Sequence, residues 1–435
     1  MYQSVSPEEA LKIVKSNNKV YIQAAAAAPQ ALIRALTDRA DELRNVEICH
    51  LHTEGPAPYA DPALAKSFHV NSFFVGGNVR HTLKAGNGSF TPVFLSELPS
   101  IFRNGIIKLD IALIQVSPPD KHGYCSLGTT VAATPAAIES AKLVIAQINP
   151  QMPRTHGDGI IHISELDIFV EYEEPIFEAT ISTPNMVEKQ IGKYIADLIE
   201  DRSTLQMGIG NIPNAVLAQL GNHKDLGIHS EMISDGVIDL ILKDVINGNY
   251  KVINPGKALI TFLLGTKRLY DYVDDNPYIE MRGADFVNNV SMIMQNPKMV
   301  AINSAVEVDL TGQVCADSIG PDIYSGPGGQ MDFIRGASLS KGGKAIIALP
   351  STTNNGISRI APFLNLGAGV VTTRSHVQYI VTEYGVAHLY GKTMKQRIHA
   401  LVEIAHPELR ESILRNYYDR KVGTPRLSRK NVIDS

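Results

Sequence analysis

Two neighbouring segments carry residues whose types and spacing point to chemistry. The first is Gln206-Met-Gly-Ile-Gly-Asn-Ile-Pro213, in which two glycines follow a short apolar run. Glycines in such a place let a ligand approach the backbone, and the helix expected after them offers unpaired N–H groups to an anion. A phosphorylated cofactor fits this pattern, and so does a simple tight turn. Pro213 stands where a dinucleotide fingerprint needs its third glycine, which argues against a nicotinamide dehydrogenase.

The second segment, Leu226-Gly-Ile-His-Ser-Glu231, ends a short apolar stretch with a glutamate. Open α/β folds place ligands at the carboxyl ends of their strands, so Glu231 is expected to project from that edge of a sheet. A carboxylate there is able to act as a nucleophile. Taken alone, a solvated or capping role is the more common one for a glutamate at a strand end.

Other reactive side chains are explained by ordinary structural roles. His50 and His52, with Glu54 beyond, are spaced like metal ligands on one strand face, but period-two polar alternation explains them and no third ligand is evident. Cys125 is more simply interpreted as a small buried thiol than as a nucleophile. Ser230 lacks the Gly-x-Ser-x-Gly elbow of α/β hydrolases, so we expect it to hydrogen-bond near Glu231. We expect no metal site.

Apolar runs of strand length alternate with amphipathic segments of helix length, the pattern of parallel α/β units. The strands expected from it are residues 19–23, 46–51, 111–116, 143–147, 299–302, 345–349 and 369–372. Helices are expected to start within 29–37 and to span 186–201, where apolar residues share one face. The predicted fold class is α/β, with two tandem similar open α/β domains and mainly parallel sheets.

Short internal matches indicate the two similar halves. A strand, a small-residue turn and a helix opened by proline occur within residues 21–32 and again within 205–216. Asp120-Lys-His-Gly123 and Asp309-Leu-Thr-Gly312 each follow an apolar run. Acidic residues and prolines between 172 and 184 mark a boundary. We expect an N-terminal domain over 1–180, a C-terminal domain carrying Glu231 over 181–435, and a site in the cleft between them.

Composition argues against several classes of partner. The net charge of -4 is small for 435 residues and the basic residues are scattered, which argues against nucleic acid. The apolar runs fall far short of the roughly 20 residues that span a membrane, and no export signal is visible at the start. Three widely separated cysteines predict neither a disulfide frame nor a zinc site. We expect a cytoplasmic protein.

Ordered motifs along nearly the whole chain are the most specific observation. They are Phe74-Val-Gly-Gly-Asn-Val-Arg80, Val116-Ser-Pro-Pro-Asp-Lys-His-Gly123, Asn149-Pro-Gln-Met-Pro-Arg154, His229-Ser-Glu-Met-Ile-Ser-Asp-Gly236, Ala301-Ile-Asn-Ser-Ala-Val-Glu-Val-Asp309, Gly326-Pro-Gly-Gly-Gln-Met-Asp-Phe333, Lys341-Gly-Gly343 and Thr382-Glu-Tyr-Gly-Val-Ala387. In these motifs the chain resembles the acetyl-CoA hydrolase/transferase family, and within it the 4-hydroxybutyrate and butyryl-CoA:acetate CoA-transferases. The resemblance implies the fold of family I CoA-transferases.

The resemblance also implies roles for single residues. The family glutamate that forms a glutamyl-CoA thioester corresponds to Glu231, and Gly329 corresponds to a glycine whose N–H faces the reacting carbonyl oxygen. The positions implied to contact CoA are Gln206, Met207, Gly208, Ile209, Gly210, Val306, Gly329 and Lys341. The spacing from Gly329 to Lys341 is shorter here than in some relatives.

The implied activity moves CoA from a short-chain acyl-CoA, butyryl- or 4-hydroxybutyryl-CoA, to acetate or a similar acid by a ping-pong mechanism. Coenzyme A is then both co-substrate and part of a covalent intermediate, and no metal is needed. An acyl-CoA hydrolase using the same glutamate is the alternative, and a non-catalytic CoA-binding module is a third reading. We expect a homo-oligomer, dimer or tetramer. In the first domain, Gln23, Ala26, Glu54 and Asn78 are expected to shape the carboxylate pocket.

Overall fold

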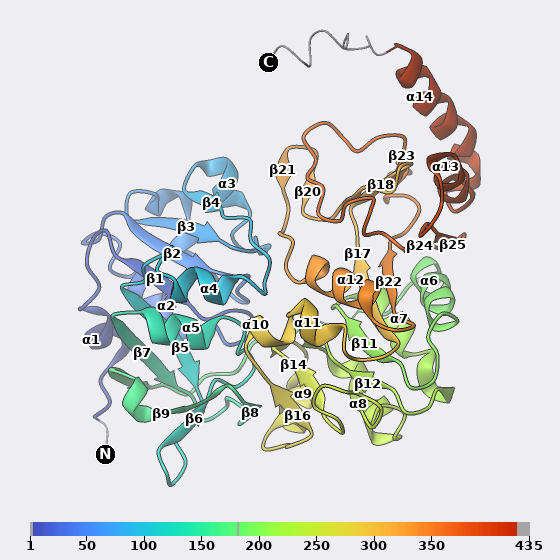
Figure 1. The fold of residues 1–435 in the computed structure, drawn as a ribbon. Helices are drawn as coiled ribbons and strands as arrows, with labels where there is room; N and C mark the ends of the chain where they lie inside the picture. The colour runs from blue at the N-terminus through green and yellow to red at the C-terminus, as the bar shows by residue number, and fades with distance from the viewer. Residues whose placement is uncertain (1–2, 181, 424–435) are drawn as a thin grey trace.

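The computed structural model describes residues 3–180 and 182–423, and two large sheets dominate it (Figure 1). The first sheet is seven-stranded and all of its strand pairs are parallel. Its strands, in spatial order, are β10 (Ile168–Glu171), β7 (Leu143–Ile148), β5 (Ile111–Val116), β1 (Lys19–Ile22), β2 (Val46–His50), β3 (Phe68–Ser72) and β4 (Gly88–Phe90).

The second sheet is eight-stranded and mixed. In spatial order it holds β15 (Phe262–Leu263), β13 (Met232–Ile233), β11 (Thr204–Met207), β17 (Met299–Ser304), β22 (Lys344–Ala348), β24 (Tyr379–Thr382) and β25 (Gly385–His388), with β12 (Gly227–Ile228) beside β11. The pairs β11–β17, β17–β22 and β22–β24 are parallel, whereas β13 and β25 run antiparallel to β11 and β24.

The same topology occurs in both sheets, which confirms the prediction of two similar α/β domains. The spatial order β10-β7-β5-β1-β2 in the first half is matched by β24-β22-β17-β11-β12 in the second. The repeated Asp-x-x-Gly turns also match in detail. The Oδ1 atoms of Asp120 and Asp309 each accept N–H bonds from the residues two and four positions ahead, and Gly123 and Gly312 both take positive φ.

Most helices lie against the sheets, whereas the last one projects away from them (Figure 1). The helices are α1 (Pro7–Leu11), α2 (Gln30–Thr37), α3 (His81–Ala85), α4 (Leu98–Arg103), α5 (Thr134–Ser140), α6 (Met186–Ala196), α7 (Asn211–Leu217), α8 (Ile238–Leu242), α9 (Lys267–Val273), α10 (Ala284–Val287), α11 (Val290–Ile293), α12 (Gln330–Leu339), α13 (Met394–Glu403) and α14 (Arg410–Gly423). Within residues 3–180 and 182–423, no helix has both the length and the apolar character to cross a membrane.

Smaller sheets complete the fold, and one of them joins the two halves. In it, β8 (His156–Gly157) pairs with β16 (Ile279–Met281), which pairs with β14 (Ala258–Ile260). The others are β6 (Tyr124–Ser126) with β9 (Ile160–His162), β19 (Val314–Cys315) with β18 (Glu307–Asp309) and β23 (Ile360–Ala361), and β20 (Ser318–Ile319) with β21 (Asp322–Ile323). The domain boundary at 180/181 lies between the two large sheets and stays a prediction.

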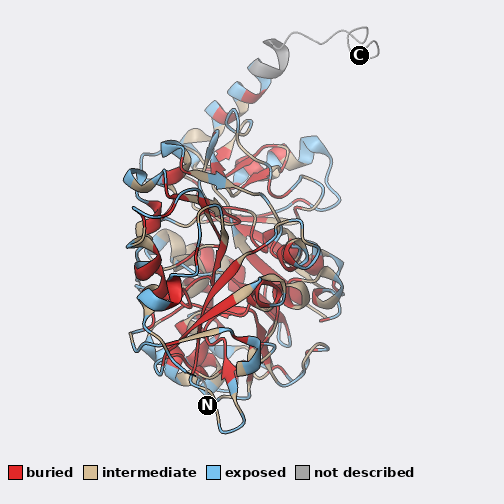
Figure 2. Cartoon of the chain, turned by 90° about the vertical axis from the view of Figure 1, so that its left-hand side faces the viewer, coloured by how far each residue is buried: buried red, intermediate tan, exposed pale blue. Residues whose placement is uncertain are grey.

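The central strands are buried along their length, as Figure 2 shows. This burial follows from parallel strands covered on both faces, whose sequences are near-continuous apolar runs. The strand expected at 369–372 is wrong, since only Thr372 forms an isolated bridge there, and the neighbouring strand begins at Tyr379. Gly367 turns the chain with φ +85°, so the short apolar stretch beyond it is part of a loop. The helix expected over 186–201 ends at Ala196.

Close packing of α6 on α7 depends on Gly192. A Cβ at this position would lie 2.8 Å from atoms of Ala215, closer than real Cβ contacts allow. We predict that Gly192→Ala lowers the free energy of unfolding by about 1–3 kcal/mol, because overpacking outweighs the gain in helix propensity. Urea unfolding measures the change. Gly221→Ala, whose Cβ would meet no atom within 4 Å, is the matched control and should unfold at the parent midpoint.

Candidate active site

A cavity of 510 Å³ lies where the two halves meet. Its walls come from the segments that follow equivalent strands: Ala24 and Ala25 after β1, 51–55 after β2, 207–209 after β11, and Glu231 after β12. The carboxyl ends of strands in both sheets therefore face one space, as expected for ligand sites in open α/β folds.

The backbone of Glu231 is fixed by neighbouring segments. Its carbonyl oxygen accepts the N–H groups of Thr261 at 3.0 Å and Phe262 at 3.1 Å. Next to it, the Ser230 hydroxyl donates to the Met207 carbonyl at 3.1 Å and lies 3.2 Å from the Met207 nitrogen. Ser230 thus ties Glu231 to the end of β11, which confirms its expected role as a hydrogen-bonding group.

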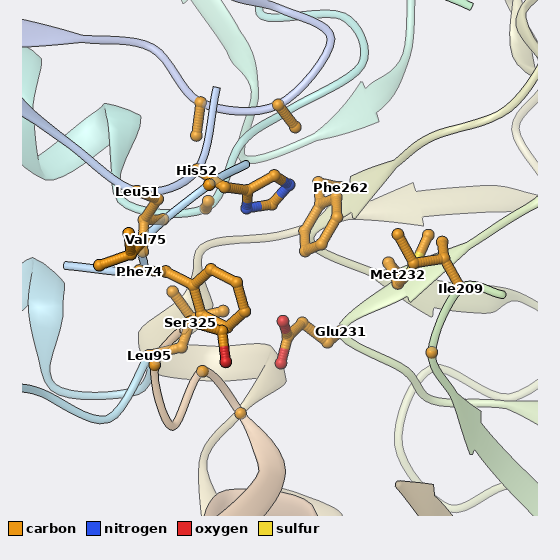
Figure 3. A pocket seen from close by; sticks show the side chains of 18 of the residues that line it. Leu51, His52, Phe74, Val75, Leu95, Ile209, Glu231, Met232, Phe262 and Ser325 are labelled. Atoms are coloured by element: carbon orange, nitrogen blue, oxygen red, sulfur yellow. The ribbon is translucent and has the colours of Figure 1, made fainter. Parts of the chain in front are cut away.

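The carboxylate of Glu231 points into the cavity below the rings of His52, Phe74 and Phe262 (Figure 3). Asn288 Nδ2 lies 3.3 Å from Oε2, and the Gly329 N–H also donates to this carboxylate. A Cβ on residue 329 would lie 2.0 Å from Oε2. Only glycine leaves room for the carboxylate and an N–H donor at this place.

Burial raises the pKa of Glu231 and the nearby negative charge of Asp332 adds to the rise, while the Asn288 and Gly329 hydrogen bonds oppose it; together these effects give a pKa of about 7. A carboxylate with a pKa near neutrality is a stronger base and nucleophile than an exposed glutamate. Strongly shifted pKa values of this kind gather at functional sites, where burial and like charges are placed together.

The Gly208-Ile209-Gly210 turn forms one wall. Gln206 at the end of β11 is held by Asn303, whose Nδ2 donates to Gln206 Oε1 at 2.9 Å. Beyond it, Gly208 faces open space and Ile209 is 52% exposed. Gly210 takes φ +110° at the N-terminal cap of α7. The turn leaves backbone and one aliphatic side chain open to a ligand.

An aromatic and aliphatic face covers the opposite side of the carboxylate. The His52 ring packs edge-on against Phe74, with centroids 5.7 Å apart, and against Phe262, at 5.5 Å. Burial lowers the pKa of His52 to about 4, so the ring is neutral near pH 7. Leu95 completes this face. The sequence analysis did not place any of these four residues in the acid-binding site, although Phe74 opens one of the motifs that carry the family resemblance.

Several predicted residues line the cavity together. They are Gln206, Met207, Gly208, Ile209, Glu231, Gly329, Glu54 and Asn78. Asn78 Nδ2 donates to the carbonyls of Thr53 at 2.9 Å and Gly55 at 3.0 Å, which shapes the loop that carries Glu54.

The structure does not bring Gln23 and Ala26 to the cavity wall. The Gln23 amide is fully buried and donates to the carbonyls of Leu127 and Thr130, so it braces the first half internally. Ala26 is also buried. Their neighbours Ala24 and Ala25 line the cavity instead.

Three of the residues expected to contact CoA lie outside the cavity lining. Gly210 borders an adjoining cavity that shares Ile209. Val306 bonds through its N–H to Cys315 just beyond the cavity edge at Ser304. Lys341 is exposed at the far end of α12, one helix length of about 15 Å from Gly329, where its carbonyl accepts the Lys298 N–H at the start of β17. That position does not support contact with a ligand at the carboxyl edge.

Contacts between the halves hold the Gly326–Gly329 loop against the first half. The N–H of Val75 donates to Ser325 at 3.2 Å, and the N–H of Leu95 donates to Gly328 at 3.0 Å. Arg80 donates through Nε to the Tyr324 carbonyl at 2.8 Å, and its guanidinium lies 3.7 Å from the Tyr324 ring centroid. The glycine that faces Glu231 is therefore positioned by both halves.

The remaining candidates show no chemistry at this site. Cys125 is buried, and burial raises its pKa to about 11. His50 is enclosed and bonds through Nε2 to Tyr59 at 3.1 Å. In the part of the chain that the structure describes, no three His, Cys, Asp or Glu side chains are grouped to hold a metal ion.

Comparisons with known proteins agree with this geometry. The model of the acetyl-CoA hydrolase/transferase N-terminal domain matches residues 1–179, and that of the C-terminal domain matches residues 265–417. A 4-hydroxybutyrate coenzyme A transferase from Clostridium kluyveri is 50% identical over 96% of this chain and 97% of its own length. A butyryl-CoA:acetate CoA-transferase from Anaerostipes caccae is 37% identical over 94% of both chains.

Solved structures show the same fold. The crystal structure of a 4-hydroxybutyrate CoA-transferase from Porphyromonas gingivalis superposes with a TM-score of 0.83 at 40% identity, covering 96% of this chain and 98% of that one. One family model matches each half of the chain, and the chain belongs to the acetyl-CoA hydrolase/transferase family.

Proposed function

We propose that this chain is an acyl-CoA:carboxylate CoA-transferase in which Glu231 carries coenzyme A as a thioester. The observation that carries the proposal is the Glu231 carboxylate in a cavity between the halves, beside the Gly329 N–H and the Gly208-Ile209-Gly210 wall. The names of the similar proteins support transfer of CoA between acids.

The first half-reaction has two covalent steps. A Glu231 oxygen attacks the acyl-CoA carbonyl carbon, the C–S bond breaks, and CoA thiolate leaves behind a mixed anhydride. The thiolate then attacks the Glu231 carbonyl carbon, the anhydride C–O bond breaks, and the donor acid leaves as a carboxylate. An acceptor carboxylate reverses these steps, which regenerates Glu231 and gives ping-pong kinetics.

Each step passes through a tetrahedral oxyanion. The Gly329 N–H and the Asn288 amide, which bond to the Glu231 carboxylate in this structure, are placed to donate to the oxygens on which that charge develops. Fixed donors of this kind contribute roughly 3–4 kcal/mol each in comparable sites. No metal enters these steps.

The cavity supports a short acid as substrate. The face made by His52, Phe74, Phe262 and Leu95 is apolar and close to Glu231, which suits the alkyl part of butyryl-CoA or 4-hydroxybutyryl-CoA with acetate as acceptor. The residues proposed to contact CoA are Gln206–Gly210, Val306 and Gly329, whereas Lys341 is left out because of its place at the far end of α12. A cytoplasmic location and a homo-oligomer stay expectations from the sequence.

Transfer and hydrolysis differ in whether water reaches the glutamyl thioester. The loop contacts between the halves and the apolar face both restrict water at Glu231, which favours transfer. An assay with and without acetate separates the two activities. CoA release that needs no acceptor acid would identify a hydrolase instead.

The covalent intermediate gives the direct test. Incubation with butyryl-CoA, reduction with borohydride and peptide mass spectrometry should place the modification on Glu231. We predict that Glu231→Gln abolishes this label and lowers transfer roughly 10³-fold or more, because the amide is not a nucleophile. Labelling at another residue, or full activity of the variant, would contradict the mechanism.

Gly329 provides a steric test. Gly329→Ala places a Cβ against Glu231 Oε2, so the variant is predicted to lose roughly 10²–10³-fold in kcat. Steady-state transfer kinetics measure the loss, and thermal unfolding reports whether the fold survives. The Gly221→Ala variant should keep the parent activity. A Gly329→Ala enzyme with near-parent kcat would remove Gly329 from the proposed role.

The pH profile tests the environment of Glu231. Only the ionised carboxylate attacks, and its pKa is raised from the ordinary value to about 7. We therefore predict that kcat/KM for the acyl-CoA falls as pH drops through about 7, since this parameter reports ionisations of the free enzyme. A profile that stays flat down to about pH 5 would show that Glu231 ionises like an exposed glutamate.

A further inference from the structure

A second buried carboxylate lies behind the nucleophile. Asp332, on the first turn of α12, is 4% exposed. Its Oδ1 accepts the Ser96 hydroxyl at 2.8 Å, and its Oδ2 lies 3.2 Å from the Ser96 nitrogen and 3.4 Å from Asn288 Nδ2. These donors are neutral. The mechanism described above gives Asp332 no task.

One amide group links the two carboxylates. Asn288 Nδ2 lies 3.3 Å from Glu231 Oε2 and 3.4 Å from Asp332 Oδ2. Asn288 is completely buried, and its Oδ1 has no hydrogen-bond partner. Two potential negative charges therefore share one donor in a water-poor place.

The covalent reaction changes this charge pair. The free Glu231 carboxylate is negatively charged and lies near the negative charge of Asp332. Like charges at short range oppose each other's ionisation. In the anhydride and in the thioester Glu231 is neutral, so the repulsion disappears when the residue is acylated. The charge on Asp332 thus favours the acylated states over the free carboxylate.

We propose that Asp332 is a positioning residue whose negative charge, next to the shared amide of Asn288, drives Glu231 toward acylation. This inference rests on the proposed function, in which Glu231 carries coenzyme A. The same charge depends on the first half of the chain, because Ser96 supplies two of the hydrogen bonds that hold it.

Other ionisable groups lie around Glu231 and Asp332. Burial raises the pKa of Asp332 and the charge of the exposed Glu97 adds a smaller rise, while hydrogen bonds from Ser96 and Asn288 oppose it, which gives a pKa of about 6. In the cavity, His52 is neutral near pH 7, burial raises the pKa of Glu54, and Arg80 is engaged with Tyr324 near the cavity edge. Asp285 on α10 pairs with Arg103 at 2.6 Å.

The test compares Asp332→Asn with the parent chain in the first half-reaction. Enzyme is mixed with butyryl-CoA and butyrate at a fixed ratio over pH 5–9, and the fraction of glutamyl-CoA is measured by mass spectrometry of the quenched protein, along with the rate of its formation. Loss of the Asp332 charge should move the acidic limb of the pH–rate profile for glutamyl-CoA formation to lower pH by about one unit. It should also reduce the equilibrium constant for thioester formation roughly tenfold, the equivalent of one pKa unit.

The direction in which the acidic limb moves distinguishes a role of the Asp332 charge from a role of its hydrogen bonds. If Asp332 only held Asn288 in place, its loss would remove a donor from Glu231, and the limb would move to higher pH. An unchanged limb, or one moved to higher pH, overturns the proposal. If the parent chain itself forms no thioester, the proposed function fails instead, so the two failures are distinct.

Two further variants keep the test decisive. Glu97→Gln removes an exposed, solvent-screened charge that is the smallest of the effects on the pKa of Asp332, so it should move the limb far less than Asp332→Asn does. Ser96→Ala leaves the carboxylate but removes the hydroxyl that favours its charge, so the limb should move to lower pH while the rate at pH 9 matches the parent. Should Asp332→Asn fail to fold, an unmoved limb in Ser96→Ala overturns the proposal.

Discussion

A partly buried carboxylate with only neutral donors bonded to it is the constraint on which this structure depends. Ionised Glu231 is costly at such a place, and the cost is limited by the Gly329 N–H and the Asn288 amide. Both donors must be held rigidly, since a shift of either would leave the charge uncompensated. A Cβ on residue 329 would lie only 2.0 Å from Glu231 Oε2, which shows how closely the loop approaches the carboxylate.

Rigidity of that kind comes from the meeting of the two halves. The loop that bears Gly329 is fixed by backbone bonds to Val75 and Leu95, and Asp332 is fixed by Ser96. Each half has its own sheet, but one hydrophobic cluster runs through both halves, and the geometry around Glu231 is complete only when both are present. The parallel sheet of β8, β16 and β14 also joins the two halves.

Much of the architecture could be predicted from the sequence. Buried parallel strands are recognisable as apolar runs, and the turn at Gly208–Gly210 is recognisable from its glycines. Glu231 was found from its place after a strand and from the family motif. Asn288 and Asp332 were not assigned roles, because α10 and α12 are brought beside Glu231 only by tertiary packing. His52 was weighed as a metal ligand, whereas it packs between Phe74 and Phe262. The sequence pattern of a helix or strand does not show which other element it packs against.

The matching topology of the two sheets assigns equivalent places to different tasks. The segment after β12 presents Glu231, and the segment after β2, its counterpart, presents His52 and Glu54 to the same cavity. In the proposed mechanism, the connection that presents Glu231 carries the covalent step, and the connection after β2 contacts the acyl group. On that proposal, exchanging residues 51–55 between relatives would change the acid preference and leave Glu231 and its hydrogen-bond donors untouched.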